Sequence, residues 1–344
     1  MERENLENLV YESLAALPAD KRFELADRLK AIIDAELLKG ALPELDHVCP
    51  ICGCDEFTRY GKTRRGTQRW RCSCCGNVRV HESTGRIIGN TKLDYDTWVA
   101  FIPLFLDHMS CDKVADRLGV CHKTAWFMRI RMLEAVFDQL PSFQVKAGSN
   151  VQVDEIYFRE SFKGTRFESM TNPPREPRTG DGAGLVSGIS DEQICVITAV
   201  NDNRDFFFDV ACRGAMTIKI AESSLRGRIS SGAIVNTDRH KSYPKVLATL
   251  GVAIHNAFDS KAREGLESVN HTHSAIKTFL APFFGVSTKW LHLYLGWYKW
   301  LRSFESDFKA ALSQMGAGDY THTWEDIRAM GTPFRDSRMN PLKA

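Results

Sequence analysis

The chain has 344 residues, of which 43% are hydrophobic and 26% are charged, and its formal net charge at pH 7 is +2. This composition is ordinary for a folded protein of two or three domains. It excludes a protein built on long membrane spans, because no apolar run approaches the roughly 20 residues that cross a bilayer. The N-terminus carries no signal-peptide pattern either, so we expect a cytoplasmic protein.

The first 46 residues predict an appendage of two amphipathic helices that separate near Leu17-Pro18. Apolar residues recur at helical spacing on both sides of this break. The segment carries 11 acidic and 6 basic side chains, whereas residues 47–81 carry 2 acidic and 7 basic ones. We expect residues 1–46 to pack against the rest of the protein or to contact a partner. The basic character of the chain is concentrated in residues 47–81.

Six of the ten cysteines lie within residues 49–75, and this clustering favours a metal site in a reducing compartment over disulfides. Two C-x-x-C pairs stand 19 residues apart, and each pair can bring two sulfurs to one tetrahedral ion. The spacing predicts a zinc ribbon over residues 47–82, with a structural Zn²⁺ ion held by Cys49, Cys52, Cys72 and Cys75. Cys54 and Cys74 fit the pattern less well. The alternative is a chance cluster of free thiols.

The hairpin between the cysteine pairs, FTRYGKTRRGTQRWR, has six Arg or Lys residues, several aromatic side chains and no acid. Basic and aromatic residues interleaved on a small module are typical of contact with a nucleic-acid backbone combined with base stacking. We predict that Arg64, Arg65 and Arg69 contact phosphates of DNA or RNA, and the ribbon alone does not decide between the two. A solvated basic face without a ligand is the alternative.

Residues 92–142 predict a helix-turn-helix region. Ser110 is a good N-cap for the first helix, and Gly119 supplies the turn before the second. The second helix of such a motif enters the major groove of DNA. Its expected outward side chains include the candidate DNA-binding residues Lys123 and Arg129. An ordinary helical hairpin without DNA contact is the alternative.

Strand-like runs then alternate with helical stretches. The predicted strands are residues 151–158, 194–200, 205–211, 232–238 and the short AIHNA run. The predicted helices are residues 217–229, YPKVLATL and residues 266–280. This order predicts an α/β domain over residues 148–305. An insert rich in Gly, Pro and charge at 160–184 predicts a mobile loop, and residues 306–344 form a C-terminal tail.

Two aspartates stand on apolar strands of this domain. Asp154 is central in VQVDEIYF, where an unpaired carboxylate would be costly, and Asp238 ends a strand 84 residues later. Two such aspartates with a ligand from a helix match the way a ribonuclease-H-like fold holds two divalent ions, about 4 Å apart, for phosphoryl transfer. Either aspartate alone would indicate only a strand-end or capping residue. Because side chains alternate along a strand, we expect Glu155 on the opposite face and outside the site.

The stretch LESVNHTHSAIKTFL, residues 266–280, predicts an amphipathic helix. At 100° per residue its polar side chains share one face, and the opposite apolar stripe consists of Val269, Ile276 and Leu280. The polar face holds Asn270, a candidate metal ligand, and Lys277. His271 and His273 fit packing or hydrogen-bonding roles as well as catalytic ones.

In order and spacing, these motifs resemble those of bacterial insertion-sequence transposases of the DDE type, in the group with an N-terminal zinc ribbon. The resemblance spans roughly residues 45–305 and rests on CPIC…CSCC, TGRIIGNTKLDYDTW, VADRLGVCHKTAWFMRIRM, VDEIYF, NTDRHKSY and NHTHSAIKTFLAPFFGVSTKWLHLYLGWYKWL. It implies a ribonuclease-H-like catalytic domain, a mixed sheet flanked by helices, preceded by a zinc ribbon and a helix-turn-helix. It also implies a Mg²⁺- or Mn²⁺-dependent enzyme that binds the terminal inverted repeats of its element, cleaves DNA strands and joins them to target DNA.

Carried over by position, the resemblance makes Asp154, Asp238 and Asn270 the ligands of two catalytic ions, with Lys277 as a fourth site residue. The third place is Glu in many relatives, seven residues before a Lys, and here Asn270 stands seven residues before Lys277. An amide oxygen ligates Mg²⁺ without adding charge, so the second ion is expected to be held more weakly. Glu267, one turn earlier on the same face, is the rival third ligand.

The resemblance further implies a homodimer or larger synaptic assembly acting on double-stranded DNA, in a bacterial cytoplasm and on the nucleoid when bound. Two other functions fit the same motifs. A DNA-binding regulator derived from a transposase would keep the ribbon and the helix-turn-helix but lose cleavage. A structure-specific nuclease on the same fold would cleave but not join.

Overall fold

The computed structural model describes residues 48–49, 51–62, 68–80, 93, 95–164, 188–259 and 264–304, together with residues 12, 17–18 and 21–22. The chain divides into two compact units. The first comprises Met1–Arg129 and Ser306–Thr321, and the second comprises Ile130–Glu305 and His322–Ala344. The predicted N-terminal helices, most of the predicted loop at 160–184, the C-terminal tail, and Arg64 and Arg65 lie outside the described residues.

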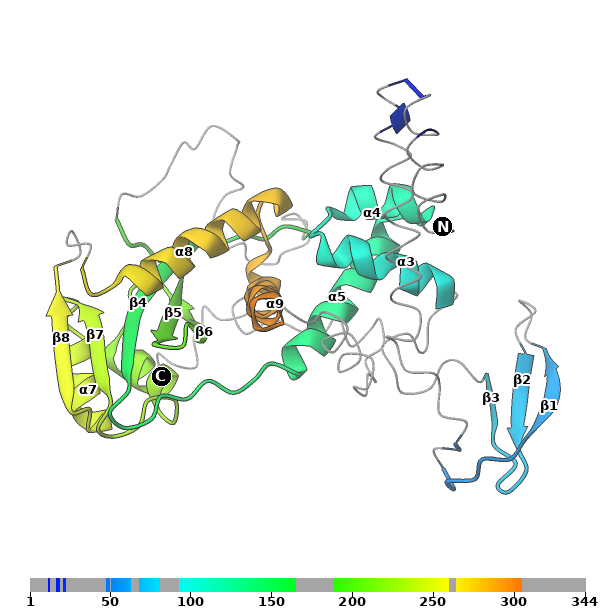
Figure 1. Cartoon of the computed structure of the whole chain (residues 1–344), viewed down its shortest axis with the longest axis horizontal. Helices are drawn as coiled ribbons and strands as arrows, with labels where there is room; N and C mark the ends of the chain where they lie inside the picture. Colours follow the sequence, from blue (N-terminus) through cyan, green and yellow to red (C-terminus); the bar gives the residue numbers. More distant parts are fainter. Residues whose placement is uncertain are drawn as a thin grey trace. The chain divides into compact units, whose positions relative to one another are not determined.

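The first unit contains a small antiparallel sheet (Figure 1). Its strands, in spatial order, are β1 (Phe57–Lys62), β2 (Gln68–Cys72) and β3 (Val78–Val80). The cysteine pairs lie at the turns that flank this sheet, where Gly53 and Gly76 each follow a cysteine pair with positive φ (71° and 70°). Glycine adopts this left-handed backbone without a steric penalty, so it suits the tight turn after each pair.

Helices follow the small sheet in the order α3 (Tyr95–Leu106), α4 (Cys111–Leu118) and α5 (His122–Asp138). The predicted boundaries between α4 and α5 are confirmed. The Ser110 hydroxyl accepts a hydrogen bond from the Lys113 backbone N–H, at 3.4 Å. Gly119 ends α4 in the left-handed conformation with φ 64°. Both caps satisfy backbone groups that a helix end otherwise leaves without partners, so the local sequence is enough to position this turn.

The second unit is built on a five-stranded mixed sheet. Its strands are β4 (Asn150–Arg159), β5 (Gln193–Asn201), β6 (Phe206–Arg213), β7 (Ile234–Asp238) and β8 (Ile254–Phe258). The spatial order is β6-β5-β4-β7-β8, with β4, β5 and β6 antiparallel and β7 and β8 parallel to β4. The predicted alternation of strands and helices is confirmed, and the mixed α/β architecture is consistent with the ribonuclease-H-like class.

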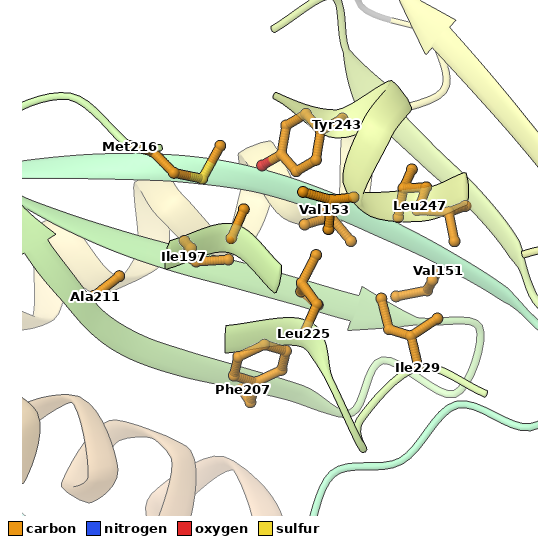
Figure 2. Close-up of a cluster of buried hydrophobic side chains, with 14 of the residues drawn as sticks. Val151, Val153, Ile197, Phe207, Ala211, Met216, Leu225, Ile229, Tyr243 and Leu247 are labelled. Atoms are coloured by element: carbon orange, nitrogen blue, oxygen red, sulfur yellow. The ribbon is translucent and has the colours of Figure 1, made fainter. Parts of the chain in front are cut away.

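Helices cover both faces of this sheet. One face packs against α6 (Ile218–Leu225) and α7 (Tyr243–Leu250) through a continuous apolar cluster, in which Val151 and Val153 of β4 lie beside Leu225 and Leu247 (Figure 2). The helix α6 is shorter than the predicted stretch 217–229, because Arg226 has an extended backbone and Gly227 follows with φ 78°.

The other face of the sheet carries α8 (Glu267–Leu280) and α9 (Leu291–Ser303), joined by two short 3₁₀ helices, η2 (Ala281–Phe283) and η3 (Thr288–Trp290). Figure 1 shows α8 lying along β4 and β5. The aromatic run in α9 belongs to the core as predicted, since Trp297 and Trp300 are fully buried. Within the part of the chain that the structure describes, no helix is both long enough and apolar enough to span a membrane.

Candidate functional site

The register of two parallel strands places Asp154 beside Asp238. In the β4–β7 ladder Val153 pairs with Thr237, so the next residues along the two strands are the two aspartates. Carboxylate oxygens of Asp154, Glu155 and Asp238 all lie within 4.8 Å of one another. Three acidic side chains separated by up to 84 positions in sequence therefore form one cluster.

The prediction that Glu155 lies outside this cluster is wrong. Its side chain leaves β4 on the face of Val153, where Tyr243 lies, whereas Asp154 leaves on the face covered by α8. Alternation along the strand therefore holds. The long glutamate side chain nevertheless brings one of its carboxylate oxygens within 4.8 Å of carboxylate oxygens of the two aspartates, next to the C-terminal end of β7. Strand alternation describes the direction of Cβ and does not limit the reach of a flexible side chain.

The cluster carries more negative charge than its surroundings compensate. Burial, together with the neighbouring Glu155 and Asp238 carboxylates, raises the pKa of Asp154 to about 7. Burial and the Asp238 carboxylate likewise raise the pKa of Glu155 to about 7. Like charges at this distance disfavour each other's ionised form, and a nearby cation would restore it. The site therefore suits a cation bound by oxygen ligands.

Backbone hydrogen bonds orient the two aspartates. Asp154 Oδ1 accepts a hydrogen bond from the Glu155 N–H at 2.9 Å, and Asp238 Oδ1 accepts one from the His240 N–H at 2.9 Å. In each case the carboxylate is held by a backbone N–H one or two residues further along the chain. The separation between the two aspartates is therefore determined by the sheet register and not by flexible side chains.

His273 lies against the cluster and is a residue that sequence reasoning left undecided. Its Nδ1 is 3.8 Å from Asp154 Oδ2, and its side chain is only 10% exposed. Burial and the positive charge of Lys277 lower the pKa of His273 to about 4, so the ring is neutral at pH 7. Helical periodicity could have assigned His273 to the buried border of α8. Only the packing of α8 on β4 identifies Asp154 as its neighbour.

Asn270 and Lys277 are exposed on α8. Asn270 precedes His273 by three residues and Lys277 follows it by four, so both side chains emerge beside His273 on the helix surface. The influence of the Lys277 charge on His273 agrees with this arrangement. The structure thus brings Asp154 and Asp238 together and lays α8 next to them, with Asn270 and Lys277 on the adjoining exposed surface.

Glu267 has different surroundings from those of Asn270. Its Oε1 accepts a hydrogen bond from the Gly265 N–H at 3.0 Å. The side chain also lines a cavity of about 800 Å³ at the turn between β5 and β6, together with Arg204, Asp205 and Tyr298. These contacts connect Glu267 with the turn between β5 and β6 and with α9, whereas His273 faces Asp154.

Gln152 connects α8 by hydrogen bonds to β4, the strand that carries Asp154. Its Oε1 accepts hydrogen bonds from the backbone N–H groups of Ser268 (2.8 Å) and Val269 (3.0 Å). Leu266 precedes the helix and has no side chain able to cap it. A strand residue two positions before Asp154 therefore satisfies the exposed N–H groups of the helix, and this capping sets the position of α8 along β4.

Four cysteine thiols converge at the small sheet of the first unit. The sulfurs of Cys49, Cys52, Cys72 and Cys75 all lie within 4.8 Å of one another. The backbone N–H of Ile51 lowers the pKa of the Cys49 thiol to about 6, and the N–H of Cys75 lowers the pKa of Cys72. Thiolates held by backbone N–H groups are the ligands that Zn²⁺ requires, so the donor set fits a structural zinc ion. Cys54 and Cys74 form a disulfide across 6.3 Å between Cα atoms, so the expectation of a metal site in place of disulfides does not hold for this pair.

Arginines and aromatic rings lie face to face on the small sheet. Arg69 and Arg71 approach the Tyr60 ring, with guanidinium carbons 5.3 and 5.5 Å from its centroid. Arg59 lies 5.9 Å from the centroid of the Trp70 ring. Such contacts hold the guanidinium planes against the sheet while leaving their charge available for an anion.

Among the predicted DNA-binding residues of α5, Lys123 is exposed but Arg129 is not. Arg129 is only 3% exposed, and its Nη2 donates a hydrogen bond to the Met109 carbonyl oxygen. The expectation that it faces outward is wrong. Arg129 follows the fully buried Ala125 by four residues, about one helical turn, so it shares that inward face. There it ties α5 to the residues just before α4.

Comparisons with known proteins identify distant structural neighbours. No family model matches the chain, and no curated protein matches it. It is similar to chains in a solved structure of a pre-cleavage Mos1 transpososome, with 13% identity and a TM-score of 0.22 over 68% of this chain and 82% of that one. It is also similar to chains of the Mos1 strand transfer complex, with 15% identity and a TM-score of 0.26 over 68% and 81%. Because both TM-scores are low, we base no functional assignment on this likeness.

Proposed function

We propose that the protein is a transposase that catalyses metal-dependent DNA strand cleavage and strand transfer. The observation that carries this proposal is the carboxylate cluster, in which adjacent parallel strands hold Asp154 and Asp238 side by side, and burial together with the Glu155 and Asp238 carboxylates raises the pKa of Asp154 to about 7. Oxygen ligands in that arrangement suit Mg²⁺ or Mn²⁺. Such an ion activates an attacking oxygen and stabilises a leaving one in phosphoryl transfer.

Each side chain at the cluster has a separate role in this proposal. Asp154 and Asp238 hold the ions, and Asn270 completes the ligand set from the exposed surface of α8. Lys277 binds the phosphate next to the scissile bond as a point charge. His273, which is neutral and buried, keeps the Asp154 carboxylate from rotating. Glu155 lies close enough to contribute to the negative charge that the ions neutralise.

The first unit supplies DNA recognition in this proposal. The four thiols hold a structural zinc ion that organises a ribbon, and the basic and aromatic side chains of that ribbon contact phosphates. The helices α4 and α5 act as a helix-turn-helix, with Lys123 on the outer side of the second helix. The DNA would be the inverted repeats of a bacterial insertion sequence, bound by a dimer or a larger assembly.

Incubation of the purified protein with labelled duplexes, taken from the sequence that flanks its gene, tests this function. With Mg²⁺ we expect nicked products and products joined to a second DNA. Asp154→Asn and Asp238→Asn should each abolish both products and leave DNA binding nearly intact, because they remove ligands and not the recognition surface. Asp259→Asn is the matched control, since Asp259 follows β8 at the same edge of the sheet and is exposed. Retained cleavage in either cluster variant would refute the assignment.

A regulator derived from a transposase is the second candidate function, and one observation favours it. Asn270 brings no charge to a cluster that needs cations, so the site could hold its ions too weakly to act. A regulator would bind the flanking duplexes with full affinity and yield no nicked product at any Mg²⁺ or Mn²⁺ concentration. A structure-specific nuclease would instead yield nicked product without joined product.

A further inference from the structure

Phe284 is the most exposed large apolar side chain among the described residues. It is 90% exposed, whereas its neighbour Phe283 is buried. Phe284 also has φ 50° and ψ 44°, in the left-handed region that side chains other than glycine rarely adopt. Both the exposure and the backbone conformation cost free energy, so the turn after η2 presents this ring at a cost to stability.

The backbone on both sides of Phe284 is held in place. Lys163 Nζ donates hydrogen bonds to the carbonyl oxygens of Phe283 (2.7 Å) and Gly285 (3.2 Å). The same turn is tied to the end of β4, because the Thr288 N–H donates to the Ser161 carbonyl oxygen at 2.9 Å and the Ser161 N–H donates to Thr288 Oγ1 at 2.9 Å. The Phe284 ring therefore projects from a turn whose backbone is held in place by hydrogen bonds.

The chain on either side of Phe284 is basic. Residues 268–304 contain no Asp or Glu, and they include Lys277 on α8 and Lys289 on η3. The Lys163 ammonium group lies directly under the turn. Among the described residues, no other large apolar side chain is exposed between α8 and α9. A single aromatic ring among cations is a poor match for an apolar protein surface, and a good match for a nucleic acid, which offers phosphates and the faces of bases.

We propose that Phe284 stacks on an unpaired base of the DNA strand held at the carboxylate cluster, while Lys163 and Lys277 contact the phosphates on either side. This inference rests on the proposed function. Phe284 follows Lys277 by seven residues that complete α8 and pass through η2, so the two residues lie within roughly 12 Å of each other, at about 1.5 Å per α-helical and 2.0 Å per 3₁₀ residue. At 3.4 Å per nucleotide, the stacked base lies within about three nucleotides of the phosphate at Lys277. By stacking on the base, the Phe284 ring would keep the end of the DNA strand unpaired at that position.

A fluorescence experiment with the full-length protein tests this inference without requiring cleavage. The probes are an intact duplex and the same duplex with a three-nucleotide gap that carries 2-aminopurine, both in buffer without Mg²⁺. We expect the wild-type protein to bind the gapped duplex about 5- to 150-fold more tightly than the intact one, as stacking of one base provides, and to change the 2-aminopurine emission. Phe284→Ala should lose both effects and keep its affinity for the intact duplex. Phe284→Tyr should retain them.

Two further variants separate stacking from folding and from general apolar contact. Phe284→Gly removes the ring and relieves the left-handed backbone, so any loss it shows cannot come from strain. Ile254→Ala removes an exposed apolar side chain on β8 and should change nothing.

A Phe284→Ala protein that keeps both the preference and the emission change would overturn the inference, as would a Phe284→Leu protein that behaves like wild type. A change in sedimentation of the DNA-free Phe284→Ala protein would overturn it too, because the ring would then belong to an interface between copies of the chain. Wild-type protein that binds neither duplex would refute the proposed function itself.

Discussion

At the residue scale, Asn270 and Glu267 lie one helical turn apart on α8 but have different surroundings. Both were candidate third ligands, because both lie on the polar face of α8. In the structure Glu267 is hydrogen-bonded to the Gly265 N–H and lines a cavity beside Asp205, whereas Asn270 is one turn from His273, which faces Asp154. We therefore retain Asn270 as the proposed ligand.

Substitution at these two positions should separate them. Asn270→Ala should reduce strand cleavage by about 100-fold, as loss of a group that holds a metal does, and Asn270→Asp should keep or raise it by adding charge. Glu267→Gln should have little effect. The measurement is the initial rate of nicking over a series of Mg²⁺ concentrations. Full activity of Asn270→Ala at limiting Mg²⁺, together with a damaged Glu267→Gln protein, would reverse the assignment.

Raised carboxylate pKa values predict how the stability of the protein without Mg²⁺ depends on pH. The pKa of Asp154 is 3.8 in an unfolded chain and about 7 in the folded one, so the folded state binds the proton more tightly. The resulting stabilisation is complete below pH 3.8 and is lost as the pH rises through about 7. In Mg²⁺-free buffer, the melting temperature at pH 8 should therefore lie on the order of 5–10 °C below that at pH 5.5.

Two controls assign this pH dependence to the cluster. Asp154→Asn should reduce the change in melting temperature between pH 5.5 and pH 8, because the amide does not titrate, and the remaining change should come from Glu155, whose pKa is also raised to about 7. Added Mg²⁺ should raise the melting temperature of wild type at pH 8 much more than at pH 5.5, and should not do so for Asp154→Asn. An equal effect of Mg²⁺ on both proteins would mean that the ion binds elsewhere.

At the scale of elements, short-range chemistry sets where helices and turns begin and end, and long-range contacts set what they face. Ser110 and Gly119 delimit α4 through their own hydrogen bonds and backbone angles. The start of α8 is different, since Gln152 of β4 supplies the cap that Leu266 cannot. Arg129 illustrates the same point, because a residue typical of a DNA-binding surface is buried against the Met109 carbonyl.

The small sheet of the first unit is expected to depend on metal. Its strands are short, and its best-buried side chains are the cysteines Cys49 and Cys72, which are each 1% exposed. We predict one zinc ion per chain by elemental analysis and a loss of that ion in Cys72→Ser. Cys111→Ser, a change at a buried thiol in α4 away from the cluster, should retain it. A wild-type protein without zinc, or an unchanged zinc content in Cys72→Ser, would contradict this.

At the scale of the whole molecule, the small net charge of +2 conceals a basic segment at residues 47–81 and an acidic cluster on the sheet of the second unit. The basic hairpin precedes the helices, and the carboxylates lie on the sheet of the second unit. Phosphate contacts provide affinity without sequence information, and they release counterions that make binding depend on salt.

Removing positive charge from the hairpin should therefore weaken binding to all DNA sequences alike. In the triple variant Arg64→Ala, Arg65→Ala and Arg69→Ala, the plot of log affinity against log salt should become shallower by about 2.7, at about 0.9 per phosphate contact. The control replaces Lys146, Lys219 and Lys245, three exposed lysines of the second unit, with alanine and so removes the same charge. An unchanged slope in the arginine variant, or an equal change in the control, would argue against phosphate contact by the hairpin.

The sequence by itself determined the secondary structure of the described regions and the pattern of chemistry along them. Strand and helix order, the caps of α4 and the buried run of α9 follow from periodicity and local hydrogen bonding, which act over a few residues. The convergence of two C-x-x-C pairs is equally local, because a hairpin brings them together.

Only the tertiary structure decided which side chains meet. The pairing of Asp154 with Asp238 depends on the register between β4 and β7, and the inclusion of Glu155 depends on how far its side chain reaches back. The approach of His273 to Asp154 depends on the packing of α8 against the sheet. These contacts join residues that are far apart in the chain, and the free energy that selects them comes from burial of the whole apolar core. No local pattern contains that information.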